Sequence, residues 1–369
     1  MSKISRTAEQ IVERWLKKGN MAARMRDILP NSGLSLEERE EVAKIVHDVV
    51  RWWNWYTFVM EHYSLPERVE TYIRLARSKD EWESAEKSVP KERYTEIRYS
   101  FSPFMASIID KEFPELREYL NMEPKTVLCV NFNLSDREEV KDILMKEGMS
   151  AEDSVMESAV ISDSRARYSR AVKEGKAQVQ DESSQLIAKI TASLGSKILD
   201  YCAGNGVKTI AMASFMRNSG KIHAWDIDEK RRKTLKKRAE IYNAKIEVLE
   251  RRPEGEYDVV FVDAPCTGVG SARRNPEAKY TDGVGDFPEK QLSILNEAKE
   301  RVRKGGYLIY CVCSFTPQES VEVIDRFMEE TKDFFEEKYE SEWLVERKHG
   351  YLTRMPEGDV MYLCIMKRT

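Results

Sequence analysis

The sequence of 369 residues predicts an α/β protein in which a helical region precedes a mostly parallel sheet. Apolar residues recur with a helical period of about 3.6 over residues 6–16 and again over residues 36–63. From residue 197 onward, apolar runs of strand length alternate with segments of helical character. This alternation is typical of a parallel sheet that helices cover on both faces. The chain is also longer than one ordinary core, so we expect two or three domains.

The composition is that of a folded protein with a well-solvated surface, because 41% of the residues are hydrophobic and 34% are charged. No apolar run is long enough to span a membrane, and the N-terminus alternates charged with apolar residues, unlike a signal peptide. We therefore expect a cytoplasmic protein, and we expect it to be a monomer. The net charge of -4 argues against general binding of polyanions, so any RNA contact must rest on a local basic patch.

The cysteines are too few and too scattered for a disulfide framework or a zinc site, and we expect no bound metal. They are Cys129, Cys202, Cys266, Cys311, Cys313 and Cys364. Each must therefore be interpreted either as part of the core or as a reactive group.

The N-terminal region is expected to be helical. Ser35 and Glu38 have the spacing of a capping box, which predicts that a helix begins at Leu36. Aromatic residues gather between Trp52 and Phe58 on this helical stretch. They could stack on RNA bases, but we favour packing between helices, because large aromatic side chains dominate core burial.

From Lys125 onward the period changes, which predicts a small α+β unit of about 50 residues. Residues 126–132 and 154–163 have strand character, and residues 135–148 have the cap and spacing of a helix that ends at Gly148. A basic segment follows, with Arg165, Arg167, Arg170, Lys173 and Lys176. The segment is interpreted either as a solvated loop or as a contact for RNA phosphates, and the sequence leaves both open.

The C-terminal half predicts a Rossmann-type sheet, whose ligands bind beyond the carboxyl ends of its strands. The expected strands cover residues 197–203, 221–228, 257–265, 305–314 and 361–367, and the expected helices begin near residue 208 and cover residues 229–244, 289–302 and 317–330. The basic run over residues 230–238 lies on the second of these helices and is interpreted as its solvent face.

The loop over residues 200–209 joins the first of these strands to its helix, and its small residues let the backbone approach a ligand at the helix N-terminus. It lacks the third glycine of a dinucleotide fingerprint and the glycine that precedes the lysine of a phosphate loop. The next strand ends at Asp226, where such a sheet presents a carboxylate to ribose, whereas Asp228 is interpreted as a helix cap. The pattern predicts a nucleoside cofactor without identifying it.

Two neighbouring strand ends carry cysteines. The third strand ends at Asp263 and is followed by Cys266, and the fourth ends with Cys311 and Cys313. A single buried cysteine usually packs as a small hydrophobic residue. Cysteines at two adjacent strand ends instead favour chemistry in one shared cleft.

Taken in order, the segments quoted next resemble the Sun, or RsmB-like, family of S-adenosylmethionine-dependent RNA 5-methylcytosine methyltransferases. The segments are GKAQVQDESSQL at 175–186, CAGNGVKT at 202–209, WDID at 225–228, DAPC at 263–266, RRNP at 273–276 and the Cys-Ser to Pro segment at 313–317. The resemblance spans nearly the whole chain. It implies a helical NusB-like domain over residues 1–120, a small α+β RNA-binding domain over 121–175 and a Rossmann-type methyltransferase domain over 176–369.

The resemblance also implies site residues and partners. Cys313 is then the covalent nucleophile, Cys266 assists release of the product, and Asp263 holds the target cytosine. The implied residues of the S-adenosylmethionine site are Cys202, Ala203, Gly204, Gly206, Lys208, Asp226 and Asp263, and the expected RNA contacts are Arg273, Arg274 and Arg167. The implied partner is a structured RNA, either ribosomal or transfer RNA.

The chain departs from the family pattern in its cofactor loop, where the family usually has Ala-Pro-Gly-Gly before the lysine and this chain has residues 204–207, Gly-Asn-Gly-Val. Val312 replaces the threonine that commonly precedes the nucleophile, and Glu250 is the candidate for the acidic residue that recognises adenine. Two other functions stay open. One is an RNA-binding assembly factor with little or no methylation activity, and the other is an NAD-dependent oxidoreductase, which requires no pair of cysteines.

Overall fold

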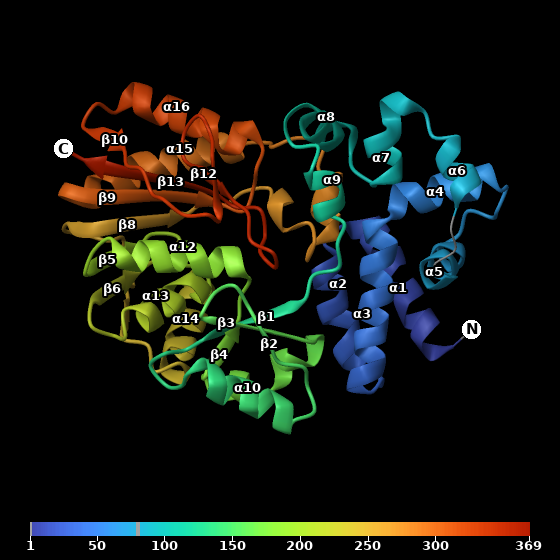
Figure 1. Cartoon of the computed structure of the whole chain (residues 1–369), viewed down its shortest axis with the longest axis horizontal. Coiled ribbons are helices and arrows are strands. Elements are labelled where there is room, and N and C mark those ends of the chain that lie inside the picture. The colour runs from blue at the N-terminus through green and yellow to red at the C-terminus, as the bar shows by residue number, and fades with distance from the viewer. Residues whose placement is uncertain (1, 79–81) are drawn as a thin grey trace. The chain divides into compact units, whose positions relative to one another are not determined.

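The structure is a computed structural model that describes residues 2–78 and 82–369 (Figure 1). The chain forms two compact units. The first comprises Met1–Glu123 together with Ser271–Gly283, and the second comprises Pro124–Gly270 together with Val284–Thr369. Residues 271–283 therefore belong to the first unit, although the residues before and after them in sequence belong to the second.

The first unit is helical, as predicted. Its helices are α1 (Lys3–Lys18), α2 (Met21–Ile28), α3 (Leu36–Arg51), α4 (Trp53–His62), α5 (Val69–Ser78), α6 (Glu83–Lys87), α7 (Tyr94–Arg98), α8 (Pro103–Glu112) and α9 (Leu116–Tyr119). The predicted capping box at the start of α3 is confirmed, because the Ser35 hydroxyl accepts from the Glu38 amide and the Glu38 carboxylate accepts from the Ser35 amide.

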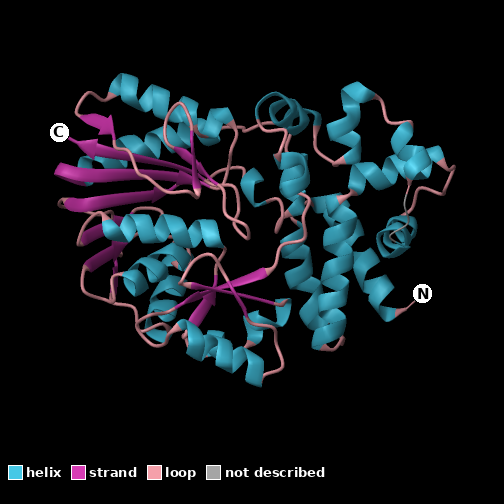
Figure 2. Ribbon diagram, viewed as in Figure 1, coloured by secondary structure: helices cyan, strands magenta, loops and turns pink. Residues whose placement is uncertain are grey.

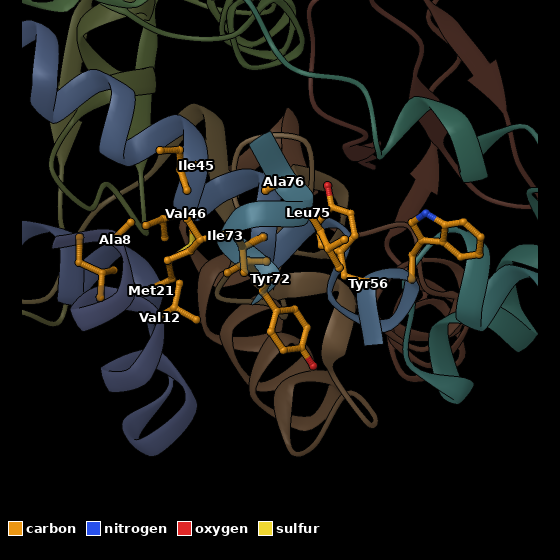
Figure 3. Packing of buried hydrophobic residues seen from close by; sticks show 14 of the residues in the cluster. Ala8, Val12, Met21, Ile45, Val46, Tyr56, Tyr72, Ile73, Leu75 and Ala76 are labelled. Atoms are coloured by element: carbon orange, nitrogen blue, oxygen red, sulfur yellow. The ribbon is translucent and has the colours of Figure 1, made fainter. Parts of the chain in front are cut away.

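The core of the first unit is formed by the apolar faces of these helices (Figure 3). Val12 of α1 and Val46 of α3 are both fully buried in it. The aromatic residues of α4 also pack into this core: the Trp53 ring stacks on Tyr72 with ring centroids 3.8 Å apart, and Trp55 is buried. Packing between helices, the favoured interpretation of this aromatic run, is confirmed.

Lys279 fastens the segment 271–283 within the first unit. Its buried ammonium donates hydrogen bonds to the carbonyl oxygens of Arg51 and Tyr99, at 2.7 and 2.8 Å, and to the side chain of Asn121. Burial lowers the pKa of Lys279 well below its usual value. Neutral oxygen partners of this kind make up for the water that the ammonium loses.

The second unit contains a small antiparallel sheet in the order β2-β3-β1-β4. Its elements are β1 (Thr126–Val130), α10 (Arg137–Lys146), β2 (Glu152–Asp153), β3 (Ala159–Ser162), α11 (Arg170–Lys173) and β4 (Ala177–Val179). β4 follows the predicted domain boundary at residue 175 yet pairs with β1. The division of the chain into three domains stays a prediction.

The large sheet of the second unit has the order β11-β12-β13-β9-β8-β5-β6-β7, with β10 paired to β13. Its strands are β5 (Lys197–Asp200), β6 (Lys221–Ala224), β7 (Ile246–Val248), β8 (Tyr257–Asp263), β9 (Val302–Val312), β10 (Phe334–Glu336), β11 (Leu344–Glu346), β12 (Tyr351–Thr353) and β13 (Tyr362–Arg368). The helices of this part are α12 (Glu182–Ser193), α13 (Val207–Phe215), α14 (Glu229–Ile241), α15 (Phe287–Ala298) and α16 (Val321–Glu330), and Figure 2 shows helices flanking the strands.

The strands from β9 to β7 are all parallel, which confirms the Rossmann-type sheet, whereas β10 to β13 pair antiparallel. From β5 the chain proceeds outward to β6 and β7 and then returns to β8 on the other side of β5. The direction of winding therefore reverses between β5 and β8. Ligands of open α/β sheets bind at the carboxyl ends of the strands at such a point.

Candidate active site

The cofactor loop, residues 200–207, follows β5 at the reversal point of the sheet. Gly206 has φ 81°, and a Cβ added there would overlap the side chain of Leu235 on α14. Gly204 also has a positive φ, of 55°, and its amide donates to the carboxylate of Asp226 at 2.9 Å. Both glycines are therefore required by backbone conformation. Asp226 is buried and connects this loop to the end of β6.

Asp228 begins helix α14, because its side chain accepts from the amides of Lys230 and Arg231. This confirms its interpretation as a helix cap. The predicted solvent face of α14 is also confirmed for Lys233 and Lys237, which are exposed. Arg238 is an exception, because its guanidinium donates to the carbonyl oxygen of Asn205 in the cofactor loop at 3.0 Å.

Asp200, at the end of β5, was not among the predicted site residues. It is 1% exposed, and one of its carboxylate oxygens accepts from the Thr209 hydroxyl at 2.6 Å. The other oxygen, Oδ1, has no hydrogen-bond partner within the described residues. Burial raises the pKa of Asp200 to about 7. A carboxyl group that ends an otherwise apolar strand is the sequence signal that could have identified it.

Lys208 and Asp263 are brought together, as the prediction requires of two residues at one site. The Lys208 ammonium, at the start of α13, lies 2.7 Å from the carboxylate of Asp263 at the end of β8. Burial alone lowers the pKa of Lys208, but the charge of Asp263 outweighs it, so the pKa lies above its usual value. The ammonium therefore stays charged beside the carboxylate.

Cys266 and Cys313 also meet, with their sulfur atoms 3.3 Å apart in a thiol hydrogen bond. The bond with Cys313, burial, and the nearby charges of Glu319 and Asp263 raise the pKa of Cys266 well above its usual value. Either sulfur can be the donor of this bond, and its length places the two thiols within reach of one another for proton transfer.

Cys311 and Cys202 have different environments. Cys311 lies in β9 with no exposed surface and belongs to the hydrophobic core of the sheet, and burial raises its pKa. Cys202, in the cofactor loop beside the half-exposed Gly204, is partly exposed, and burial likewise raises its pKa. Ala203 is buried, and its amide donates to the carbonyl oxygen of Trp225.

Glu319 connects the segments that carry the two cysteines, and sequence reasoning missed it. It is fully buried, and it accepts from the amide and hydroxyl of Thr267 and from the hydroxyls of Ser314 and Thr316. An acidic residue near the start of a helix is usually solvent-exposed and stabilises the helix dipole. The sequence signal for Glu319 therefore resembles that of an ordinary surface residue.

The three predicted RNA contacts differ in exposure. Arg167 is exposed, and its guanidinium donates to the Ser164 carbonyl oxygen at 2.9 Å. Arg274 is half-buried. Arg273 has no exposed surface, and its guanidinium lies over the Tyr119 ring and donates to the Tyr119 hydroxyl at 3.1 Å. The prediction that Arg273 contacts an RNA phosphate is therefore wrong for this structure, because such a contact needs an exposed guanidinium.

The other basic residues near Arg167 have acidic partners. Arg165 pairs with Asp163, and Arg170 pairs with Glu174. Lys176 pairs with Glu174 and Glu139. Much of the positive charge of this segment is therefore neutralised locally, and Arg167 is the better candidate for a phosphate contact.

The described residues contain neither a cluster of metal ligands nor a membrane-spanning helix. Within residues 2–78 and 82–369, no three or more histidine, cysteine, aspartate or glutamate side chains are grouped so that they could hold a metal ion. In the same part of the chain, every helix is too short or too polar to cross a membrane.

Comparison with known proteins identifies relatives of this chain. Residues 190–364 match the family model described as 16S rRNA methyltransferase RsmB/F. The probable ribosomal RNA small subunit methyltransferase B of Bacillus subtilis is 32% identical over 268 residues, which are 66% of this chain and 60% of that protein. The ribosomal RNA small subunit methyltransferase B of Photorhabdus laumondii is 30% identical over 244 residues, which are 61% of this chain and 57% of that protein. The chain thus spans about 60% of the length of these relatives.

Solved structures share the fold. The crystal structure of PH0851 superposes with a TM-score of 0.77 at 19% identity, and the match covers 99% of this chain and 98% of that one. The crystal structure of NSun6 from Pyrococcus horikoshii superposes with a TM-score of 0.60 at 14% identity and covers 76% of this chain and 98% of that one.

Proposed function

Because the chain belongs to the Sun/RsmB-like methyltransferase family, we propose that it transfers a methyl group from S-adenosylmethionine to carbon 5 of a cytosine in RNA. The names of its relatives favour ribosomal RNA over the transfer RNA that the sequence also left open. The observation that carries the proposal is the pair of sulfur atoms, 3.3 Å apart, on the segments that follow β8 and β9.

The first chemical task is to make carbon 5 of cytosine nucleophilic. A thiolate does this by adding reversibly to carbon 6, so that the electron pair of the double bond becomes available at carbon 5. We assign this addition to Cys313. When Cys266 is the donor of the bond between the two sulfurs, Cys313 accepts it, and a thiolate that accepts a hydrogen bond is stabilised before it attacks.

Lys208 and Asp263 are assigned to the target base. The carboxylate of Asp263 accepts from the amino group of cytosine at its Watson-Crick edge, which selects cytosine over uracil. The ammonium of Lys208, 2.7 Å from that carboxylate, stabilises negative charge that builds on the ring as sulfur adds. The base must leave its stack to reach these groups, which favours unpaired sites in the RNA.

The residues of the cofactor loop fit S-adenosylmethionine, which supplies a methyl group on a positively charged sulfur. Asp226 and the unpartnered oxygen of Asp200 offer carboxylate acceptors beside a backbone that Gly204 and Gly206 allow to turn sharply. We propose that Asp226 receives the ribose hydroxyls and that the amides of this loop hold the methionine portion.

Cys266 is assigned to the release of product. After methyl transfer, the proton on carbon 5 departs to solvent, its electron pair restores the ring double bond, and the bond from carbon 6 to Cys313 breaks. The S–H group of Cys266, whose sulfur lies 3.3 Å from that of Cys313, then donates to the departing thiolate. Without that donor, expulsion of the thiolate is slower and the covalent adduct persists.

The experiment that tests this function compares single cysteine variants on RNA and S-adenosylmethionine. Cys313→Ala should neither form an adduct nor methylate. Cys266→Ala should accumulate a protein-RNA adduct that survives denaturing electrophoresis and disappears when Cys313 is also replaced. Cys311→Ala is the control, because this core cysteine should affect neither result.

Two outcomes would overturn parts of the proposal. If Cys311→Ala abolished the adduct and Cys313→Ala did not, the nucleophile would be misassigned. If calorimetry detected no binding of S-adenosylmethionine, the alternative of an RNA-binding assembly factor without methylation activity would be favoured.

A further inference from the structure

Glu319 is the most heavily hydrogen-bonded carboxylate described in the candidate active site. Its Oε1 accepts from the backbone amide of Thr267 at 2.8 Å and from the Gln291 side chain at 3.3 Å. Its Oε2 accepts from the hydroxyls of Thr267, Ser314 and Thr316, at 2.5, 2.7 and 3.1 Å. The side chain has no exposed surface.

These donors come from both cysteine-bearing segments. Thr267 directly follows Cys266, and Ser314 directly follows Cys313. One carboxylate therefore bridges the segment after β8 to the segment after β9 at the residue next to each sulfur. Its donors are neutral amides and hydroxyls, and each oxygen of this buried side chain accepts from at least two of them, as a buried polar group requires.

The chemistry of the donors explains why a carboxylate stands here. An ionised carboxylate only accepts hydrogen bonds, and its oxygens together offer about four lone-pair sites. Three hydroxyls converge on Oε2 and can all donate to it at once. An amide has only one oxygen, so its NH2 group would have to face either these hydroxyls or the N–H groups of Thr267 and Gln291, and one set of donors would lose its acceptor.

We propose that Glu319 is a positioning residue that holds the segments of Cys266 and Cys313 together, so that the two sulfurs stay within hydrogen-bonding distance. The chemical purpose of that distance rests on the proposed function. The positioning itself is a property of the folded chain and is measured without RNA or cofactor. Loss of Glu319 should let the two segments separate and should leave the S–H group of Cys266 out of reach of Cys313.

The test uses the thiol oxidant diamide on the full-length protein. Diamide takes two electrons and two protons from a pair of nearby thiols, which join in a disulfide while diamide is reduced to the hydrazine. The rate of disulfide formation between Cys266 and Cys313, followed by mass spectrometry of peptides, reports how closely the sulfurs are held. We expect Glu319→Ala to slow it by about tenfold or more, the equilibrium equivalent of losing one or two net hydrogen bonds.

Two further variants make the result decisive. Glu322→Ala is the matched control, because Glu322 lies on the same segment, is exposed, and should leave the rate unchanged. Ser314→Ala combined with Thr316→Val cuts the same link from the side of Cys313 while retaining Glu319, and it should also slow oxidation. This double variant decides the test if Glu319→Ala does not fold, as judged by circular dichroism.

A second readout distinguishes positioning from general damage. Glu319→Ala should lower kcat for RNA methylation while leaving KM for S-adenosylmethionine unchanged, because the hydrogen bonds of Glu319 are made to residues outside the cofactor loop. Oxidation at the wild-type rate in a folded Glu319→Ala or in the double variant would overturn the proposal. Wild-type protein that fails to methylate RNA but shows the predicted oxidation rates would overturn the proposed function and leave the positioning role intact.

Discussion

Replacing Asp200 with asparagine should stabilise the protein, relative to the wild type, more at pH 8 than at pH 5. The Asp200 carboxyl is 1% exposed, and burial raises its pKa to about 7 in the folded protein, while an aspartate in the unfolded chain has a pKa of about 3.9. Between these two values the folded protein holds a proton that the unfolded chain has lost. Stability therefore falls as the pH rises through this window and levels off above pH 7.

The magnitude follows from the width of that window. From pH 5 to the folded pKa of about 7, two units at about 1.4 kcal/mol each amount to about 3 kcal/mol of lost stability. Asparagine does not ionise, so the variant avoids this loss. Any cost of burying the asparagine amide is independent of pH and cancels when the two pH values are compared. The unfolding free energy of Asp200→Asn minus that of the wild type should thus increase by about 3 kcal/mol from pH 5 to pH 8.

The assay is urea unfolding of both proteins without cofactor, followed by far-ultraviolet circular dichroism at pH 5, 6.5 and 8. The helical unit is the same in both proteins, so its contribution cancels in the difference. A gap that stays constant across the three pH values would show that Asp200 ionises normally in the folded state. A gap that narrows as the pH rises would reverse the sign of the argument and refute it.

Two further predictions follow from hydrogen bonds of charged side chains in the second unit. Asp258→Asn should destabilise the protein above pH 4, because hydrogen bonds, above all that from Arg303, lower the pKa of Asp258 to about 2. In urea unfolding, the difference in stability between variant and wild type should fade as the pH drops from 4 towards 2. A difference that persisted at pH 2 would contradict this prediction. Arg238→Met should weaken the binding of S-adenosylmethionine, measured by calorimetry, by about tenfold, because the cofactor loop loses a hydrogen bond to a charged group. Lys237→Met is the control, since Lys237 is an exposed neighbour and its replacement should leave the affinity unchanged. Equal affinities of the two variants would contradict this prediction.

Much of the large sheet could be predicted because its central strands are strongly apolar and lie between helices with clear caps. The strands β10, β11 and β12 could not be predicted, since each covers only three residues. Such short segments carry no periodic pattern. They become strands by pairing: β10 and β12 pair with β13 near the end of the chain, and β11 pairs with β12. Their structure is fixed by tertiary contacts that local sequence does not show.

The same distinction explains which site residues could be found. Asp263, Cys266 and Cys313 follow apolar strands, and parallel strands bring their carboxyl ends to one edge, so the meeting of these residues was foreseeable. The burial of Arg273 was not, because an arginine in a polar segment predicts exposure, and its partner Tyr119 lies 154 residues away in sequence. Glu319 was missed for the same reason, since its role depends on hydroxyls that come together only in the folded sheet.

The unusual cofactor loop shows how tertiary contacts can replace a local sequence device. A proline restricts the backbone of the loop in which it lies. The family usually has a proline in this segment, whereas this chain has Asn205 there. Here Arg238 donates to the carbonyl oxygen of Asn205 at 3.0 Å and to the side chain of Gln178 at 2.8 Å, and Gln178 donates to the carbonyl oxygen of Val207 at 2.8 Å. The loop is therefore held at two carbonyl groups by α14 and β4. An altered loop sequence consequently does not by itself argue for a lost cofactor site, because the restraint that proline would give within the loop comes from residues outside it.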